Sequence, residues 1–131
     1  MKKAKLLGVT GLAAVLTAGV LYAQAPGFTR IPVQDRDLSI PDRHAVQARA
    51  EFDPGGVAAR PTHPGEELSV VLEGQLLLEV DGQPARTVKA GESFFIPMGV
   101  IHAGTNTGSG KAVVLATYIV EKGKPVATMV K

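Results

Sequence analysis

The sequence predicts an all-β domain. Short apolar segments with the two-residue period of β-strands recur along the chain, and turn-forming glycine, proline and aspartate residues separate them. After residue 23, no segment has a helical period long enough to predict a helix, and no internal repeat is found. Two sheets facing each other, or one sheet curled shut, would bury enough apolar surface to stabilise about a hundred residues.

The first 23 residues are typical of a secretory signal peptide. Three lysines precede an apolar run over residues 6–23, and alanines 23 and 25 offer the small residues that signal peptidase selects. We expect cleavage after Ala23 or Ala25, and Pro26 disfavours the second position. An uncleaved anchor is the alternative, because the run is near the minimum length of a membrane span. Cleavage predicts a secreted, periplasmic protein with no membrane attachment.

The net charge and the absence of cysteine limit the partners and metal ligands that the protein can have. The chain has 14 Lys and Arg against 12 Asp and Glu. Removal of the three signal-peptide lysines leaves 11 basic residues against 12 acidic residues, a net charge of −1, so the sequence predicts no nucleic-acid partner. The chain has no cysteine, so it forms no disulfide and offers no thiolate ligand. A metal site would have to use imidazole, carboxylate and water.

The predicted domain begins with an extended segment. Residues 24–38 have little periodicity and are interpreted as an N-terminal extension or an edge strand, which leaves 39–131 as the β domain. The first clear strand covers 46–52, where Val, Ala, Ala and Phe alternate with Gln, Arg and Glu. Residues 53–56, Asp-Pro-Gly-Gly, end that strand with a strong turn sequence.

Two consecutive hairpins are predicted next. Residues 68–72 and 75–80 are apolar strands separated by Glu-Gly, and Asp81-Gly82 then favours a two-residue turn. Residues 93–96 form a further strand before Pro97, and 104–110 are expected to form a polar loop. The longest β-branched run, 111–120, predicts a strand, and the C-terminal residues after it are expected to pair with a sheet edge or cover one.

Two groups of residues have a spacing that no generic strand requires. The first group spans 55–74 and the second spans 91–106, and their order and spacing resemble the two sequence motifs of the cupin family. The resemblance covers nearly all of the chain after the signal peptide and implies a small, single-domain, type-2-like member with a jelly-roll β-barrel. The residues that carry it are Gly55, His63, Glu67 and Gly74 in the first motif, and Gly91, Pro97, Gly99, His102 and Asn106 in the second.

The resemblance also implies a metal centre. The usual ligands of the family are three histidines and one glutamate, and His63, Glu67 and His102 match three of them, whereas Pro61 stands at the fourth position. Two imidazoles and one carboxylate suit a divalent ion such as Fe, Mn or Zn. Pro61 leaves two alternatives open. The missing ligand provides a coordination position for water or substrate, or it marks a barrel without metal.

Several residues near these motifs have structural interpretations. Taken singly, His63 and Glu67 could be exposed loop and surface groups. His44 is interpreted as structural or exposed, and Asn106 as a residue that fixes a loop by hydrogen bonds. Glu66 would lie outside the site or orient a ligand. The glycines of the motifs and Pro97 are assigned mainly to the scaffold.

Two functions follow from the resemblance. The first is a metal-dependent enzyme that acts on a small organic molecule by oxidation or isomerisation. The second is a non-catalytic cupin that binds a small molecule, with a degenerate or empty metal site. The sequence shows no nucleophile motif and no phosphate-binding loop, so any chemistry would depend on the metal. Because small barrels often cover exposed edges with a partner, a homodimer is expected.

Overall fold

The computed structural model describes residues 25–130, and this range contains β-strands and no helix, which confirms the all-β prediction. No helix within it is therefore long and apolar enough to cross a membrane. The predicted signal peptide lies outside the described residues. The strands are β1 (Phe28–Asp37), β2 (Arg43–Phe52), β3 (Val57–Ala58), β4 (Pro61–Thr62), β5 (Gly65–Glu73), β6 (Gln75–Val80), β7 (Arg86–Lys89), β8 (Ser93–Ile96), β9 (His102–Thr105), β10 (Ala112–Glu121) and β11 (Thr128–Met129).

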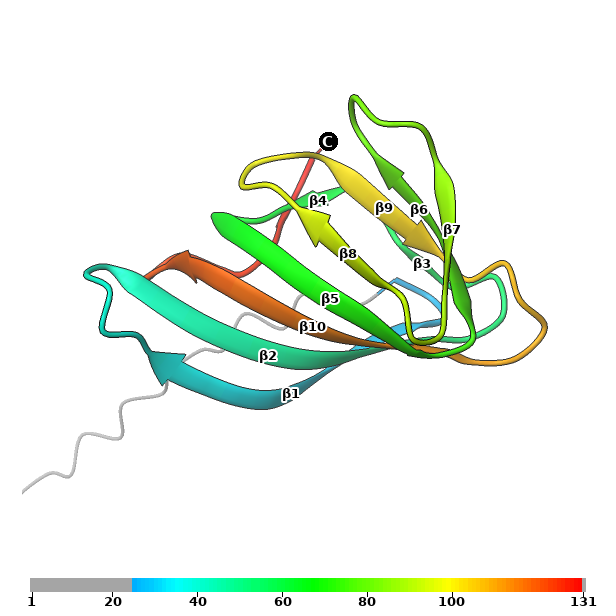
Figure 1. Cartoon of the computed structure of the whole chain (residues 1–131), viewed down its shortest axis with the longest axis horizontal. Helices are drawn as coiled ribbons and strands as arrows, with labels where there is room; N and C mark the ends of the chain where they lie inside the picture. The colour runs from blue at the N-terminus through cyan, green and yellow to red at the C-terminus, as the bar shows by residue number, and fades with distance from the viewer. Residues whose placement is uncertain (1–24, 131) are drawn as a thin grey trace, which may run out of the picture.

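The strands form two main antiparallel sheets that face each other. The larger sheet has the order β1-β2-β10-β5-β8, and the smaller sheet has the order β3-β9-β6-β7. In Figure 1 the smaller sheet lies over one end of the larger sheet, while β1 and β2 extend beyond it. β11 and β4 form a separate two-stranded ladder. This arrangement is the predicted jelly-roll architecture.

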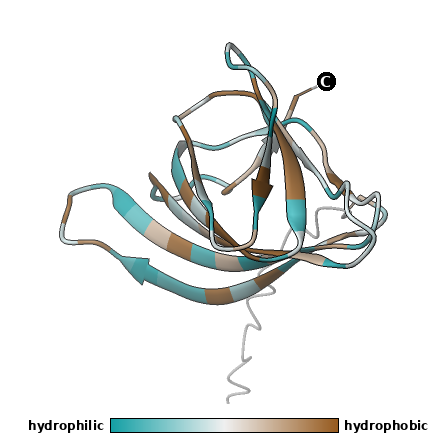
Figure 2. Ribbon diagram, turned by 45° about the vertical axis from the view of Figure 1, so that its right-hand side comes forward, coloured by the Kyte–Doolittle hydropathy of each residue, from teal (hydrophilic) through white to brown (hydrophobic). Residues whose placement is uncertain are grey.

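The core lies between the two sheets. Burial alternates along parts of β2 and β10, and the hydropathy colours of Figure 2 change from residue to residue along the long strands. Burial of each large apolar side chain favours folding by roughly 1.5–3 kcal/mol. The larger sheet contributes Phe52, Val71, Ile96 and Val114 to the main cluster, and the smaller sheet contributes Leu76, Leu78, Val80 and Val88.

The first predicted hairpin is wrong. β5 and β6 follow each other in the sequence but do not pair, because β5 lies between β10 and β8 in the larger sheet whereas β6 lies between β9 and β7 in the smaller sheet. The chain passes from one sheet to the other at Gly74, which has a φ of 72°. A Cβ atom at Gly74 would lie 2.6 Å from the carbonyl oxygen of Lys111. The glycine therefore permits both the left-handed backbone and the close approach.

Two further boundaries differ from the prediction. The β6–β7 hairpin exists, but residues 81–85 connect its strands, so the turn is longer than the two residues predicted. Gly104 and Thr105 belong to β9 and not to a loop, because they pair with Leu78 and Leu77 of β6. Their composition is typical of a loop, and the tertiary pairing overrides it.

The first and last strands of the described residues, β1 and β11, each pair with a single neighbouring strand. β1 is an edge strand of the larger sheet and pairs with β2. β11 pairs with β4 through Thr128–Thr62 and Met129–Pro61, as expected for the C-terminal residues. β11 therefore places the C-terminal segment beside the first sequence motif.

The crossing at Gly74 provides a test of the fold. We expect Gly74→Ala to lower the free energy of unfolding by about 3 kcal/mol or more, because strain of the left-handed backbone adds to the clash with Lys111. Gly82→Ala is the matched control, since Gly82 has a similar φ of 82° with no atom within 4 Å of the added Cβ. Its cost should be about 1–2 kcal/mol. Equal losses in urea unfolding would contradict the crossing.

Candidate metal centre

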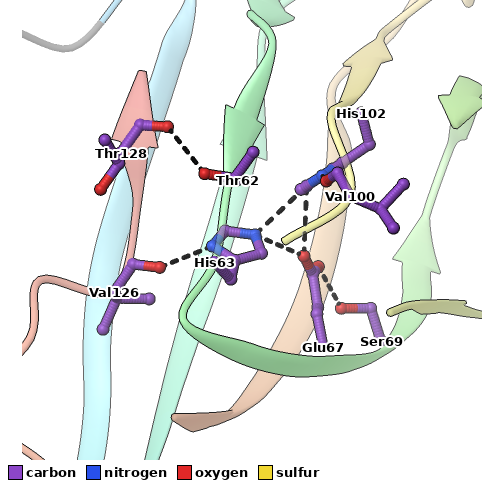
Figure 3. Close-up of polar contacts among 8 residues, drawn as sticks. All are labelled: Thr62, His63, Glu67, Ser69, Val100, His102, Val126 and Thr128. Carbon is purple, nitrogen blue, oxygen red and sulfur yellow. Dashed lines mark hydrogen bonds and ion pairs between the residues drawn. The ribbon is translucent and has the colours of Figure 1, made fainter. Parts of the chain in front are cut away.

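His63, Glu67 and His102 converge inside the barrel. Each offers one ligand atom, and these three atoms lie within 4.8 Å of one another. Nε2 of His63 is 2.9 Å from Oε2 of Glu67 and 3.2 Å from Nε2 of His102, and Nε2 of His102 is 3.5 Å from the same carboxylate oxygen. Figure 3 shows the two rings and the carboxylate directed at a common point. All three side chains are buried.

The two sheets supply different members of this group. Glu67 lies on β5 of the larger sheet, opposite Tyr118 of β10. His102 begins β9 of the smaller sheet, opposite Val80 of β6. His63 lies between β4 and β5, and its carbonyl oxygen accepts a hydrogen bond from the Gly99 amide at 3.0 Å, which joins the two sequence motifs. The group exists only when the sheets face each other.

Backbone carbonyl groups orient both imidazole rings. Nδ1 of His63 lies 2.6 Å from the carbonyl oxygen of Val126, and Nδ1 of His102 lies 3.0 Å from that of Val100. A carbonyl oxygen only accepts hydrogen bonds, so each Nδ1 carries the proton that it donates. When a ring is protonated, its Nε2 donates to Glu67; when it is neutral, its Nε2 is unprotonated and directs a lone pair toward the same point. This is the tautomer that a metal ligand needs.

The carboxylate of Glu67 is held in its ionised form. Burial alone would raise its pKa, but hydrogen bonds with His102 and His63, the charge of His63 and the hydroxyl of Ser69 together lower the pKa from 4.5 to about 2. Ser69 donates to Oε1 at 2.7 Å, which leaves Oε2 facing the histidines. An ionised oxygen beside two ring nitrogens needs positive charge, which protonated imidazole or a metal ion can supply.

The spacing of the three atoms fits a metal ion. Ligand atoms that each lie about 2.1 Å from a metal are separated by about 3.0–3.4 Å in octahedral or tetrahedral arrangements. The observed separations of 2.9, 3.2 and 3.5 Å cover this range. The charge of the set is also suitable, because two neutral imidazoles and one carboxylate are ligands of Fe, Mn and Zn ions. The group is therefore able to hold a divalent cation.

A small cavity adjoins the three side chains. Its volume of about 40 Å³ exceeds the minimum of roughly 10–15 Å³ for a water molecule, so it suits a few waters or a compact organic molecule. Much of its wall is apolar, formed by Phe52, Leu76, Leu78, Phe94 and other side chains. Among the described residues, the polar side chains that line it besides the three candidate ligands are those of Arg30 and Tyr118.

Tyr118 packs directly against the candidate ligands. Its ring centroid lies 4.7 Å from that of His63 in an edge-on arrangement. Burial raises the pKa of the Tyr118 hydroxyl, and the nearby Glu67 carboxylate raises it further, although Arg30 opposes this. The hydroxyl therefore keeps its proton and can act as a hydrogen-bond donor.

Pro61 lines the same cavity as the three candidate ligands. It is buried and pairs with Met129 through the backbone. Its ring carries no donor atom, so the side chain at this position cannot complete a set of four ligands. The departure from the motif is therefore located at the wall of the cavity itself.

The other residues considered in the sequence lie outside this group. His44 pairs with Asp35 and Asp37 on the edge strand β1. Asn106 fixes a loop, since its amide nitrogen donates to the carbonyls of Phe52 and Gly110 and its side-chain oxygen accepts from the Gly108 amide. These are the roles predicted for both residues.

The position of Glu66 is decided by strand alternation. Residues 65, 67, 69 and 71 of β5 are buried, whereas Glu66 belongs to the alternate, more exposed set. It therefore lies on the outer face, and the alternative in which it orients a ligand is wrong.

Sequence reasoning missed four contributors to the site. Ser69 could have been found, because residues two apart on a strand share a face. The carbonyls of Val100 and Val126 carry no sequence signal. Tyr118 depends on the pairing of β10 with β5, which sequence periodicity does not specify.

Comparison with known proteins identifies the domain. The family model described as Cupin domain matches residues 48–118, more than half of the chain. The chain belongs to the cupin family. Oxalate oxidase 2 of Hordeum vulgare is 33% identical over 78 residues, in an alignment that covers 53% of this chain and 35% of that protein. The HTH-type transcriptional regulator PuuR of Escherichia coli (strain K12) is 33% identical over 79 residues, covering 60% of this chain and 42% of that protein.

Solved cupin structures support the same fold. A solved oxalate oxidase structure aligns with a TM-score of 0.59 and 31% identity, over 66% of this chain and 46% of that one. Oxalate oxidase in complex with the substrate analogue glycolate aligns over 98% of this chain and 74% of its own at a TM-score of 0.65. Its identity of 23% limits that likeness to the fold. Against the two curated relatives described above, the chain spans less than half of their length.

Ser69 provides a test of the buried carboxylate. We expect Ser69→Ala to lower the free energy of unfolding by about 1–3 kcal/mol, because Oε1 of Glu67 would lose its donor in a buried position. Ser93→Ala, at an exposed position of β8, should change it by less than about 0.5 kcal/mol. Urea unfolding of the metal-free protein measures both. A Ser69 variant as stable as the parent would contradict the assigned hydrogen bond.

Proposed function

We propose that this cupin binds one divalent metal ion through His63, Glu67 and His102 and acts on a small organic molecule, by oxidation or isomerisation. The observation that carries the proposal is the convergence of two imidazole nitrogens and one carboxylate oxygen on a buried point beside a cavity. Fe, Mn and Zn are the candidate ions. A bound ion would supply Lewis-acid or redox chemistry.

Residues around the metal site would orient its ligands, limit the access of water and contact the bound molecule. The carbonyls of Val126 and Val100 orient the two histidines, and Ser69 orients the glutamate. The apolar walls of the cavity limit the access of water, which strengthens electrostatic interactions inside. Tyr118, with its proton retained, is available to donate a hydrogen bond to a bound molecule. Pro61 leaves one corner of the site for that molecule or for water.

Pro61 also favours a second candidate function. A cupin with one ligand missing would hold its metal less tightly, and its barrel could bind a small molecule without turnover, with the metal site degenerate or empty. The similarity to a protein named as a transcriptional regulator supports this alternative, because a cupin domain can occur in a protein that is not named as an enzyme. The similarity to oxalate oxidase favours the enzyme.

Location and assembly remain proposals of the same kind. We propose that residues 1–23 direct export to the periplasm, on the basis of their sequence alone. We also propose a homodimer, because β1 and β8 are the edges of the larger sheet and a partner could cover such edges. Neither proposal is required for the metal centre.

Metal content separates the two candidate functions. We expect the purified protein, dialysed against Zn, Mn or Fe and measured by elemental analysis, to hold about one ion per chain. His102→Ala and His102→Gln should lose most of it, because each removes one of three ligands. His44→Ala is the matched control, since His44 of β2 pairs with Asp35 and Asp37 of β1, away from the three candidate ligands, and its loss should leave the metal content unchanged.

Two outcomes would count against the enzyme. Metal retained at the same stoichiometry in both His102 variants would show that the ion binds elsewhere. No metal in the parent or in any variant would favour the non-catalytic alternative. Circular dichroism should show that the His102 variants retain the β structure of the parent.

A further inference from the structure

Arg30 places a cation at the same cavity as the candidate ligands. It lies on β1, and its side chain lines the cavity together with His63, Glu67 and His102. Its Nε atom is buried, although the residue as a whole is half-buried. A guanidinium stays charged in proteins, so this wall of the cavity is positive.

Two neighbouring rings lie close to the guanidinium of Arg30. Its Cζ atom lies 5.5 Å from the centroid of Phe28 and 5.6 Å from that of Tyr118, both within the range of cation–π attraction. Residue 28 of β1 is half-buried and packs against the core, and residue 30 shares its face, so strand alternation directs Arg30 to the interior. Its partner on β2 is Ala50, whose small side chain lines the same cavity.

Arg30 and the metal centre are close enough to act on one molecule. The ring centroid of Tyr118 lies 4.7 Å from the ring centroid of His63 and 5.6 Å from Cζ of Arg30. The His63 centroid and Cζ of Arg30 are therefore at most about 10 Å apart. A compact molecule, together with its hydrogen bonds at one end and a metal contact at the other, spans such a distance. The cavity of about 40 Å³ excludes large ligands.

The chemistry of Arg30 indicates which end of the molecule it would take. Guanidinium binds carboxylate through two parallel hydrogen bonds, and such charge-assisted pairs are among the strongest polar contacts in proteins. A neutral molecule cannot form such a charge-assisted pair with the guanidinium. The apolar walls would add to the discrimination, because they strengthen the attraction between opposite charges.

We propose that the cavity takes a small carboxylate, with its carboxylate group on Arg30 and its other end toward the metal held by His63, Glu67 and His102. Arg30 is thereby the residue that selects anionic ligands, and the Tyr118 hydroxyl beside it is positioned to donate a further hydrogen bond to them. This inference rests on the proposed function, because the end of the ligand that is not bound to Arg30 would contact the metal.

Calorimetric titration of glycolate and of its neutral amide into the zinc-loaded protein tests the inference. Glycolate should bind, and glycolamide should bind at least ten times more weakly. Arg30→Met should weaken glycolate binding at least tenfold, and Arg30→Lys should recover part of that loss, because lysine keeps the charge and loses the paired geometry. Arg36→Met is the matched control, since Arg36 is exposed on the same strand and donates to the carbonyl of Asp35.

The possible results separate this inference from the proposed function. Unchanged metal content with lost glycolate binding in Arg30→Met supports both. Unchanged metal content with glycolate binding within twofold of the parent overturns the role of Arg30 alone, as does a parent that binds no glycolate. If the parent binds no metal, the proposed function fails, and the same titration on metal-free protein decides whether Arg30 still selects the carboxylate. Thermal unfolding confirms that each variant is folded.

Discussion

The charge of Glu67 is the constraint on which the interior of this cupin depends. An ionised carboxylate that is 5% exposed costs several kcal/mol to bury unless groups around it supply compensating hydrogen bonds or positive charge. Ser69 satisfies one oxygen from the same strand, and the two histidines face the other oxygen from different parts of the chain. The barrel brings these groups together, and a buried charge of this kind is typical of a site with a chemical task.

The orientation of the histidines extends this constraint to the end of the chain. The carbonyl of Val126, which holds His63, lies just before β11, and β11 pairs with the short strand that contains Pro61. The C-terminal segment is therefore part of the site and not only a covered edge. The same ladder places Pro61, which cannot coordinate, at the wall of the cavity. At this corner of the metal centre, the pairing of β4 with β11 therefore places a side chain that cannot act as a ligand.

Much of the architecture could be predicted from local patterns. Alternation identified β2, the β-branched run identified β10, and the motif spacing identified the three converging side chains. The exchange of sheets at Gly74 could not be predicted, because a glycine between two apolar strands is equally typical of a hairpin. The strand through Gly104 and Thr105 was missed because pairing with β6 overrides a composition typical of a loop. Arg30 and Tyr118 were missed because their place depends on which strands are neighbours in the sheet.

The direct measurement of the central claim is the coordination shell of the metal-loaded protein by X-ray absorption. We expect the zinc spectrum to show two imidazole nitrogens at about 2.0–2.1 Å, one carboxylate oxygen at about 2.0–2.2 Å and the remaining positions filled by light atoms of water. Multiple scattering from two imidazole rings should be present. A shell with one imidazole or none would contradict the account, because His63 and His102 would then not share the ion.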